Sequence, residues 1–107
     1  EENLAPYSGL EVGFSVLCLD KPDVVYPFVR GVLEEVVAIF PSQHIHIGGD
    51  EIKHPLYADF GARAAKMVED MGRTPVAWEE ASVADTSPTM LLQLWNDGYD
   101  IAPAVAE

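Results

Sequence analysis

The sequence predicts an α/β fold made of β/α units, and two observations carry this prediction. Segments with helical periodicity alternate with short apolar runs, in an order typical of parallel sheets. Each predicted strand also ends where carboxylates or a tryptophan appear, in Gly-Gly-Asp-Glu, Trp-Glu-Glu and Trp-Asn-Asp. In barrels of this class the reactive residues gather at the C-terminal ends of the strands. We therefore expect a partial (β/α)8 TIM barrel of about three to four β/α units.

Length and composition describe one small globular domain. The 107 residues are 49% hydrophobic and 22% charged, which argues against disorder. The formal charge of −12 predicts that neither nucleic acid nor an anionic membrane is a partner, and a neutral or cationic substrate fits it better. No apolar run is long enough to span a membrane, and no signal-peptide pattern occurs. The single cysteine excludes an internal disulfide and a zinc-finger type of site, and we expect no cofactor.

The first predicted helix covers residues 23–39. A Lys-Pro-Asp sequence at 21–23 is a suitable helix entry, because proline favours the first turn and an acid favours the positive end of the helix dipole. Apolar residues then recur at three- and four-residue spacing until Pro41 ends the helix. Residues 13–20 form an apolar run that is either a short strand or the extended lead-in to this helix. Residues 1–12 are predicted to be loop or edge material.

The remaining predicted elements alternate in type along the chain. In order, they are a strand at 44–48, a helix at 57–71, a strand at 74–78, a turn-like segment at 81–88, a strand at 90–95 and the start of a helix at 101–107. Gly72 is the expected C-terminal stop of the second helix. The side chains of that helix that we expect to face inward are Leu56, Phe60, Ala64, Met67 and Val68.

The stretch from His44 to Glu51, with the sequence HIHIGGDE, is the centre of the predicted site. An apolar strand ends at two glycines, which free the backbone for positive φ angles or for the close approach of another group. Asp50 and Glu51 follow directly. Because adjacent residues at a strand end point to opposite faces, we expect the two carboxyl groups to lie in unlike environments. A general acid beside an ionised partner requires such an arrangement.

This stretch resembles the His-x-Gly-Gly-Asp-Glu signature of the family 20 glycoside hydrolases, the β-N-acetylhexosaminidases. The resemblance extends over roughly residues 15–97. Residues 76–80, VAWEE, are similar to the next barrel strand of the family, which usually reads Gly-Trp-Asp-Glu, and residues 93–95 are similar to the strand after it. The resemblance implies a hydrolase of carbohydrate metabolism that binds an N-acetylhexosamine-containing glycan or chitooligosaccharide, such as one ending in N-acetylglucosamine, and that uses no metal.

The resemblance also implies a substrate-assisted retaining mechanism, an exception to the scheme with two protein carboxylates. The acetamido oxygen of the substrate attacks its own anomeric carbon and forms an oxazolinium intermediate. Asp50 holds the acetamido N–H and stabilises the developing positive charge, while Glu51 protonates the leaving oxygen and then deprotonates water. Trp78 and Trp95 match tryptophans that wall the sugar pocket of the family. The alternative role for both is that of core residues at strand ends.

Three strands of a barrel leave two unpaired edges and an uncovered apolar face. A complete barrel needs eight strands and about 250 residues. We therefore expect residues 1–107 to be a fragment of a family 20 catalytic barrel, or a shortened relative that covers this surface by forming a homo-oligomer. The stretch between Glu51 and Trp78 is also shorter than is usual in the family, which predicts a remodelled rim. The family is typical of secreted, periplasmic or lysosomal-type compartments.

Two other functions are compatible with the sequence. The first is a truncated, non-catalytic carbohydrate-binding or assembly module derived from the same barrel. The second is a metal-dependent hydrolase that uses His46, Asp50 and Glu51, although this spacing matches no recognised set of metal ligands.

Overall fold

The computed structural model describes residues 8–10, 17–85 and 88–96. The elements within these ranges are, in order, α1 (Pro22–Ile39), β1 (His44–His46), α2 (Tyr57–Asp70), β2 (Thr74–Trp78), the 3-10 helix η1 (Glu79–Val83) and β3 (Leu91–Gln93). The helix start predicted at 101–107, most of residues 1–12 and half of residues 13–20 lie outside the described residues.

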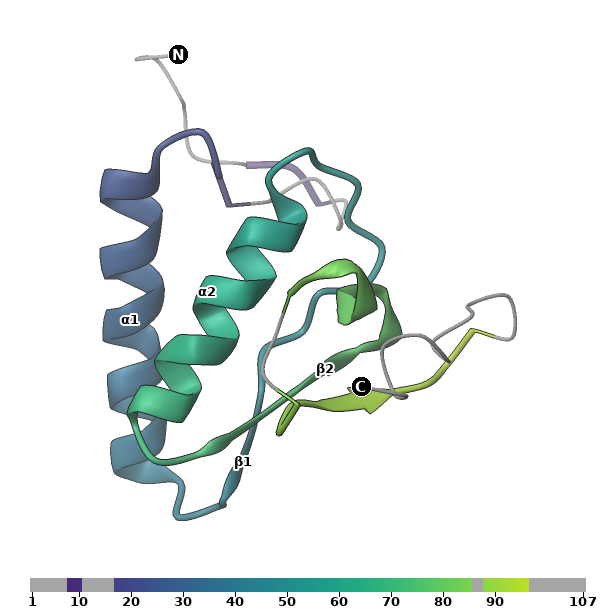
Figure 1. Ribbon diagram of the computed structural model, residues 1–107. Coiled ribbons are helices and arrows are strands. Elements are labelled where there is room, and N and C mark those ends of the chain that lie inside the picture. The colour runs from purple at the N-terminus through teal and green to yellow at the C-terminus, as the bar shows by residue number, and fades with distance from the viewer. Residues whose placement is uncertain (1–7, 11–16, 86–87, 97–107) are drawn as a thin grey trace.

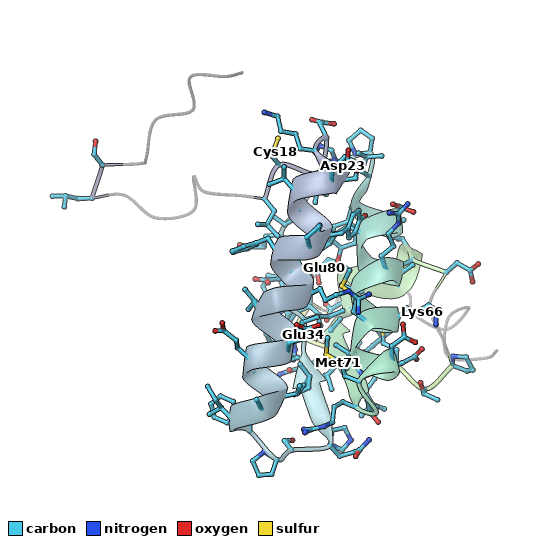
Figure 2. All side chains as sticks on the ribbon, turned by 90° about the vertical axis from the view of Figure 1, so that its left-hand side faces the viewer. Cys18, Asp23, Glu34, Lys66, Met71 and Glu80 are labelled. Atoms are coloured by element: carbon cyan, nitrogen blue, oxygen red, sulfur yellow. The ribbon has the colours of Figure 1, made fainter. Side chains whose placement is uncertain are left out.

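The three strands form one parallel sheet in the order β1-β2-β3. His44 is paired with Thr74, and Ala77 with Leu92. In Figure 1, α1 and α2 lie together on one side of the strands, and Figure 2 shows the two helices side by side in front of the sheet. This arrangement confirms the predicted α/β class. Within the described ranges, only β1 is followed by an α-helix and a further strand, since η1 is the helix between β2 and β3, so the number of barrel units stays a prediction.

Alternation along the strands separates a covered face of the sheet from an open one. Ile45, Pro75 and Ala77 point toward the helices and are buried, because successive strand residues point to opposite faces. Ile45 forms a core cluster with Leu33 of α1 and Met67 and Val68 of α2. The residues of the opposite face are more accessible to solvent: His44, His46, Thr74, Val76, Trp78, Leu91 and Gln93.

Both helices agree with the sequence prediction to within one residue at each end. The C-terminal end of α2 shows why a local sequence signal could predict a helix boundary. Gly72 has a φ angle of +76°, its N–H donates to the carbonyl of Glu69, and the next N–H donates to the carbonyl of Val68. This is the Schellman arrangement that glycine favours after a helix. The prediction that Leu56 faces inward is wrong, because Leu56 precedes the first turn of α2 and is exposed.

Arg73 connects the C-terminal end of α1 to the start of β2. Its guanidinium donates to the main-chain carbonyls of Val37 at 3.1 Å, Phe40 at 3.0 Å and Ser42 at 2.5 Å. The last turn of α1 contains no basic residue of its own. Arg73 therefore supplies both donors and positive charge to carbonyls in the last turn of α1 and just beyond it.

We expect Arg73→Leu to lower the free energy of unfolding by about 2–3 kcal/mol, because several carbonyls lose a charged donor at once. Arg73→Lys recovers only part of this loss, since an ammonium lacks the planar fork of donors. Chemical unfolding followed by circular dichroism measures both effects. The control is Lys66→Leu, which removes an exposed pair with Asp70 and is expected to leave the unfolding midpoint nearly unchanged. Similar losses in the Arg73→Leu and Lys66→Leu variants contradict this assignment.

Candidate active site

The candidate site lies at the C-terminal edge of the sheet, where the three strands end beside one another. Main-chain hydrogen bonds continue past the end of β1. The N–H of Ile47 donates to the carbonyl of Val76 at 2.8 Å, and the N–H of Trp78 donates to the carbonyl of Gly48 at 3.1 Å. These bonds fix the start of the glycine turn against the end of β2.

Two glycines turn the chain directly after β1. The φ angles are +75° at Gly48 and +98° at Gly49, values that side-chain-bearing residues rarely adopt. The strand predicted to reach residue 48 therefore ends at His46. Asp50 and Glu51 are both exposed and project from this turn rather than from a strand end, so the strand alternation invoked above does not set their directions.

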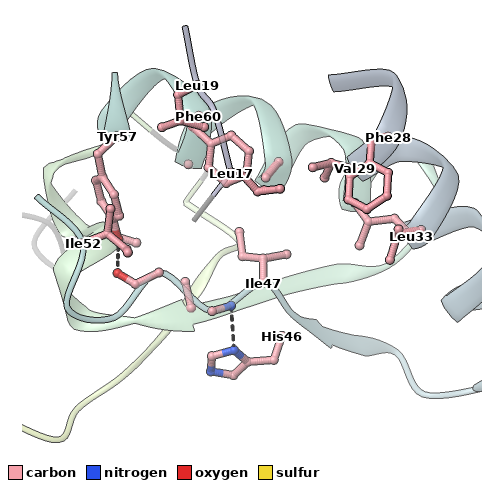
Figure 3. A pocket seen from close by; sticks show the side chains of 17 residues that line it. Leu17, Leu19, Phe28, Val29, Leu33, His46, Ile47, Ile52, Tyr57 and Phe60 are labelled. Atoms are coloured by element: carbon pink, nitrogen blue, oxygen red, sulfur yellow. Dashed lines mark hydrogen bonds between the residues drawn. The ribbon is translucent and has the colours of Figure 1, made fainter. Parts of the chain in front are cut away.

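Tyr57 holds the turn from the side of α2. Its hydroxyl donates to the carbonyl of Gly49 at 2.5 Å, and its side chain is buried (Figure 3). A Cβ atom added at Gly49 lies only 2.7 Å from the Tyr57 hydroxyl, whereas one added at Gly48 meets nothing within 4 Å. On the strand side, Nδ1 of His46 accepts the N–H of Gly48 at 3.0 Å. Tyr57 was not among the site residues predicted from the sequence.

We expect Gly49→Ala to lower the free energy of unfolding by about 2–4 kcal/mol. The new Cβ atom comes too close to the Tyr57 hydroxyl, and the φ angle is unfavourable for alanine. Gly48→Ala serves as the matched control and is expected to cost about 1–2 kcal/mol, from backbone strain alone. Chemical unfolding of the two variants measures the difference. A larger loss in Gly48→Ala than in Gly49→Ala contradicts the close approach of Tyr57.

Three aromatic rings follow one another along the open face at this edge. The ring centroids of His46 and Trp78 are 5.3 Å apart, and those of Trp78 and Trp95 are 6.3 Å apart at an interplanar angle of 70°. Trp95 is 49% exposed among the described residues. The two tryptophans singled out from the sequence therefore lie close together, with one ring accessible to solvent.

Two buried carboxylates, for which the sequence predicts no role, form hydrogen bonds between residues that follow different strands. Glu79 is fully buried and accepts the main-chain N–H groups of Trp95 at 2.6 Å and Asn96 at 2.7 Å. Glu80 accepts the indole N–H of Trp95 at 3.2 Å and lies 3.4 Å from the main-chain nitrogen of Glu51. Their position in the sequence, directly after β2, could have indicated that Glu79 and Glu80 lie at the same edge of the sheet as the other candidate residues.

Two cavities lie near the site. One of about 440 Å³ is on the helix side of the sheet, between α1, α2 and the end of β1, and has a mostly apolar lining (Figure 3). Neither the Asp50–Glu51 pair nor the two tryptophans line it. A second, of about 210 Å³, lies beside Glu80 and is also lined by Lys53 and His54.

The described part of the chain contains neither a metal-binding cluster nor a membrane-spanning helix. Among those residues, no group of three or more His, Cys, Asp or Glu side chains is arranged to hold a metal ion. Within the same ranges, no helix is both long and apolar enough to cross a membrane.

Comparison with known families identifies the chain. The model of the glycosyl hydrolase family 20 catalytic domain matches residues 3–59, which include the glycine turn and both carboxylates of the Asp50–Glu51 pair. The chain belongs to this family. Family 20 comprises glycosidases of the β-N-acetylhexosaminidase type, so the resemblance inferred from the sequence is confirmed.

Relatives with known activity or structure agree with the family assignment. The β-N-acetylhexosaminidase of Cellulomonas fimi is 41% identical over 103 residues, which cover 94% of this chain and 21% of that enzyme. The family 20 β-N-acetylhexosaminidase of Streptomyces coelicolor A3(2) superposes with a TM-score of 0.79 at 38% identity, over 98% of this chain and 23% of that one. The chain thus spans about a fifth of these family 20 relatives. The small parallel sheet is similar to part of their TIM barrels.

A third relative carries bound ligands. The Streptomyces plicatus N-acetyl-β-hexosaminidase in complex with Thio-NAglucal superposes with a TM-score of 0.79 at 37% identity, over 98% of this chain and 22% of that one. A mutant of the Streptomyces plicatus enzyme has been solved in complex with its product, GlcNAc. An amino sugar is therefore the ligand of this relative.

Proposed function

We propose that this chain carries the catalytic carboxylates, Asp50 and Glu51, of a β-N-acetylhexosaminidase that hydrolyses terminal N-acetylhexosamine residues of glycans or chitooligosaccharides. The observation that supports this most is the position of the pair. Both residues follow a glycine turn at the C-terminal end of a parallel strand. The half-buried Trp78 ends β2, and the exposed Trp95 follows β3. Catalytic residues of β/α barrels occupy this edge.

In the first step the substrate supplies its own nucleophile. The acetamido oxygen attacks the anomeric carbon, the bond to the leaving oxygen breaks, and an oxazolinium ion forms. The carboxylate of Asp50 accepts the acetamido N–H, orients the acetamido oxygen and stabilises the positive charge that spreads over the new ring. Correct orientation of a nucleophile that is already attached can lower a barrier by several kcal/mol, up to about 7–11 kcal/mol in ideal intramolecular reactions.

Glu51 moves the protons in both steps. As the glycosidic bond breaks, the protonated carboxyl group gives its proton to the leaving oxygen. Water then attacks the anomeric carbon of the oxazolinium ion while the Glu51 carboxylate takes a proton from that water, which restores the acetamide and the protonated acid. Two displacements at the same carbon retain its configuration. The scheme uses no metal or cofactor.

Trp78 and Trp95 form the wall of the sugar pocket in this proposal. A sugar ring exposes patches of C–H bonds that pack on an aromatic face, and a tryptophan N–H can still reach a polar partner. The exposure of Trp95 and its contact with Trp78 support this role. The amino-sugar complexes of the Streptomyces plicatus enzyme support N-acetylhexosamine as the ligand.

The open face of the sheet, which presents Trp78, Val76 and Leu91, must be covered before it can form a closed pocket. We expect further strands to complete it, either from additional chain or from a second copy of this one. A test of catalysis therefore needs the remainder of a family 20 barrel around these residues.

The experiment replaces the segment of the Cellulomonas fimi enzyme that aligns with this chain by the chain itself. We call the product the segment-exchanged enzyme. It is expected to release nitrophenol from nitrophenyl N-acetyl-β-glucosaminide at least about 10³ times faster than from nitrophenyl β-glucoside, which lacks the acetamido nucleophile. Equal rates on the two substrates contradict substrate assistance. A folded segment-exchanged enzyme without turnover contradicts the proposed function.

A further inference from the structure

The carboxylate of Glu80 lies between two parts of the proposed site that come from different strands. Its Oε1 is 3.4 Å from the main-chain nitrogen of Glu51 and 3.2 Å from the indole nitrogen of Trp95, and its Oε2 is 3.3 Å from that same indole nitrogen. The contact to Glu51 is long for a hydrogen bond, and the indole is nearly equidistant from both oxygens. Only 9% of Glu80 is exposed. One largely buried carboxylate therefore faces the backbone of the proposed acid and the ring of the proposed sugar wall.

The backbone of Glu51 needs support of this kind. Its φ angle is +54°, in the left-handed region, which is unfavourable for a residue with a side chain. Such conformations persist only where the surrounding structure holds them. The Tyr57 hydroxyl holds the turn at the carbonyl of Gly49, and Glu80 faces the turn at the N–H of Glu51.

The indole of Trp95 needs support for a different reason. Trp95 lies after the end of β3 and is half exposed, so packing alone does not fix its ring. Glu79 accepts the main-chain N–H of Trp95, which fixes the backbone but leaves the side chain to rotate. The contact between the indole N–H and Glu80 sets the direction of the ring. The two adjacent glutamates thus act on different parts of Trp95.

We propose that Glu80 is a positioning residue that holds the Glu51 backbone and the Trp95 indole in a fixed relation to each other. This role rests on the proposed function of Glu51 and Trp95. Glu80 exchanges no proton with the substrate. It keeps Glu51 and the indole of Trp95 at a fixed distance and orientation, so that a sugar packed on Trp95 presents its glycosidic oxygen to Glu51.

The first test is spectroscopic and uses this 107-residue chain. Its two tryptophans give two indole N–H signals in proton–nitrogen NMR spectra, and Trp95→Phe identifies the signal of Trp95. Glu80→Gln is expected to shift that signal and to speed its exchange with solvent about tenfold, while the Trp78 signal stays in place. A Trp95 signal at the position of a freely exposed indole in the unmodified chain overturns the proposal. So does a signal that Glu80→Gln leaves unchanged.

Glu79→Gln is the matched control, because it makes the same chemical change at the neighbouring residue. It is expected to shift the main-chain N–H signals of Trp95 and Asn96 and to leave the exchange rate of the Trp95 indole unchanged. If both glutamine variants alter the indole equally, Glu80 acts only through general stability and the proposal is overturned.

The second test is kinetic and uses the segment-exchanged enzyme. Glu80→Gln is expected to lower kcat/KM about tenfold. Trp95→Phe keeps an aromatic wall but removes the indole N–H, so the double variant is expected to lose less than the product of the two single losses. Glu79→Gln combined with Trp95→Phe is expected to give the full product. Independent effects of Glu80→Gln and Trp95→Phe contradict the positioning role.

Glu51→Gln separates the two levels of the proposal. If this variant keeps its turnover, the proposed function fails, and the positioning role fails with it. If Glu51→Gln abolishes turnover while Glu80→Gln changes neither kcat nor KM, only the positioning role fails.

Discussion

Glu51→Gln in the segment-exchanged enzyme is expected to lower kcat on a chitooligosaccharide by about 10³-fold, within the range that general acid–base catalysis contributes. Glutamine has the shape of glutamate but can neither give a proton to the leaving oxygen nor take one from water. Binding of N-acetylglucosamine is expected to change little, because the sugar wall is intact. Steady-state kinetics give the loss of turnover, and calorimetry gives the affinity for the sugar.

The leaving group provides an internal check on the role of Glu51. Nitrophenolate departs without a proton, whereas a sugar alkoxide does not, so the loss is expected to be smaller on the nitrophenyl substrate than on the chitooligosaccharide. Glu35→Gln, the same substitution at an exposed position of α1, is the control and is expected to leave kcat unchanged. A Glu51→Gln variant that hydrolyses chitooligosaccharides at the original rate rules out Glu51 as the acid.

Asp50→Asn is expected to lower kcat by about 10²–10³-fold, the loss that usually follows removal of one well-placed electrostatic group. Asparagine keeps a carbonyl oxygen that can accept the acetamido N–H. It lacks the negative charge that stabilises the oxazolinium ion as it forms. The loss is therefore expected in the step that forms the ion, and single-turnover kinetics with the nitrophenyl substrate measure that step.

Asp50→Asn also changes substrate preference if the mechanism is substrate-assisted. The preference for the N-acetyl substrate over the glucoside is expected to fall together with kcat, because only the N-acetyl substrate uses Asp50. Asp23→Asn, at an exposed position in the first turn of α1, is the control. A loss of turnover that is equal on both substrates contradicts an interaction with the acetamido group.

The helices were predictable because their signals are local. Pro22 and Gly72 mark ends that a short stretch of sequence determines, and the periodic apolar residues between these ends identify the buried faces. The parallel pairing of β1 with β2 follows from the helix between them, since a strand, helix and strand in succession favour this topology. Both predictions depend on residues that are neighbours in the sequence.

The residues of the candidate site could be proposed from the sequence, but their geometry could not be predicted. Asp50 and Glu51 were identified from their motif, yet the end of β1 at His46 depends on the φ angles that Gly48 and Gly49 adopt. Glycine permits these angles without dictating them. The contact with Tyr57, which selects them, comes from a helix eight residues further along the chain.

The roles of Glu79 and Glu80 could not be predicted, because their partners are distant in the sequence. Glu80 contacts residues 29 positions before it and 15 positions after it, and Glu79 contacts the main chain 16 positions after it. Two acids after a strand are more often solvated than buried. Only the parallel order of the three strands brings Glu51 and Trp95 to opposite sides of these acids.

Hydrolysis of the oxazoline of N-acetylglucosamine tests the central claim most directly, because this compound is the intermediate that the Asp50–Glu51 pair is proposed to form and consume. The segment-exchanged enzyme is expected to open the oxazoline to the β-anomer of N-acetylglucosamine at least about 10² times faster than its Glu51→Gln variant does. Equal rates for the two proteins, or the α-anomer as first product, would contradict substrate-assisted hydrolysis by this pair.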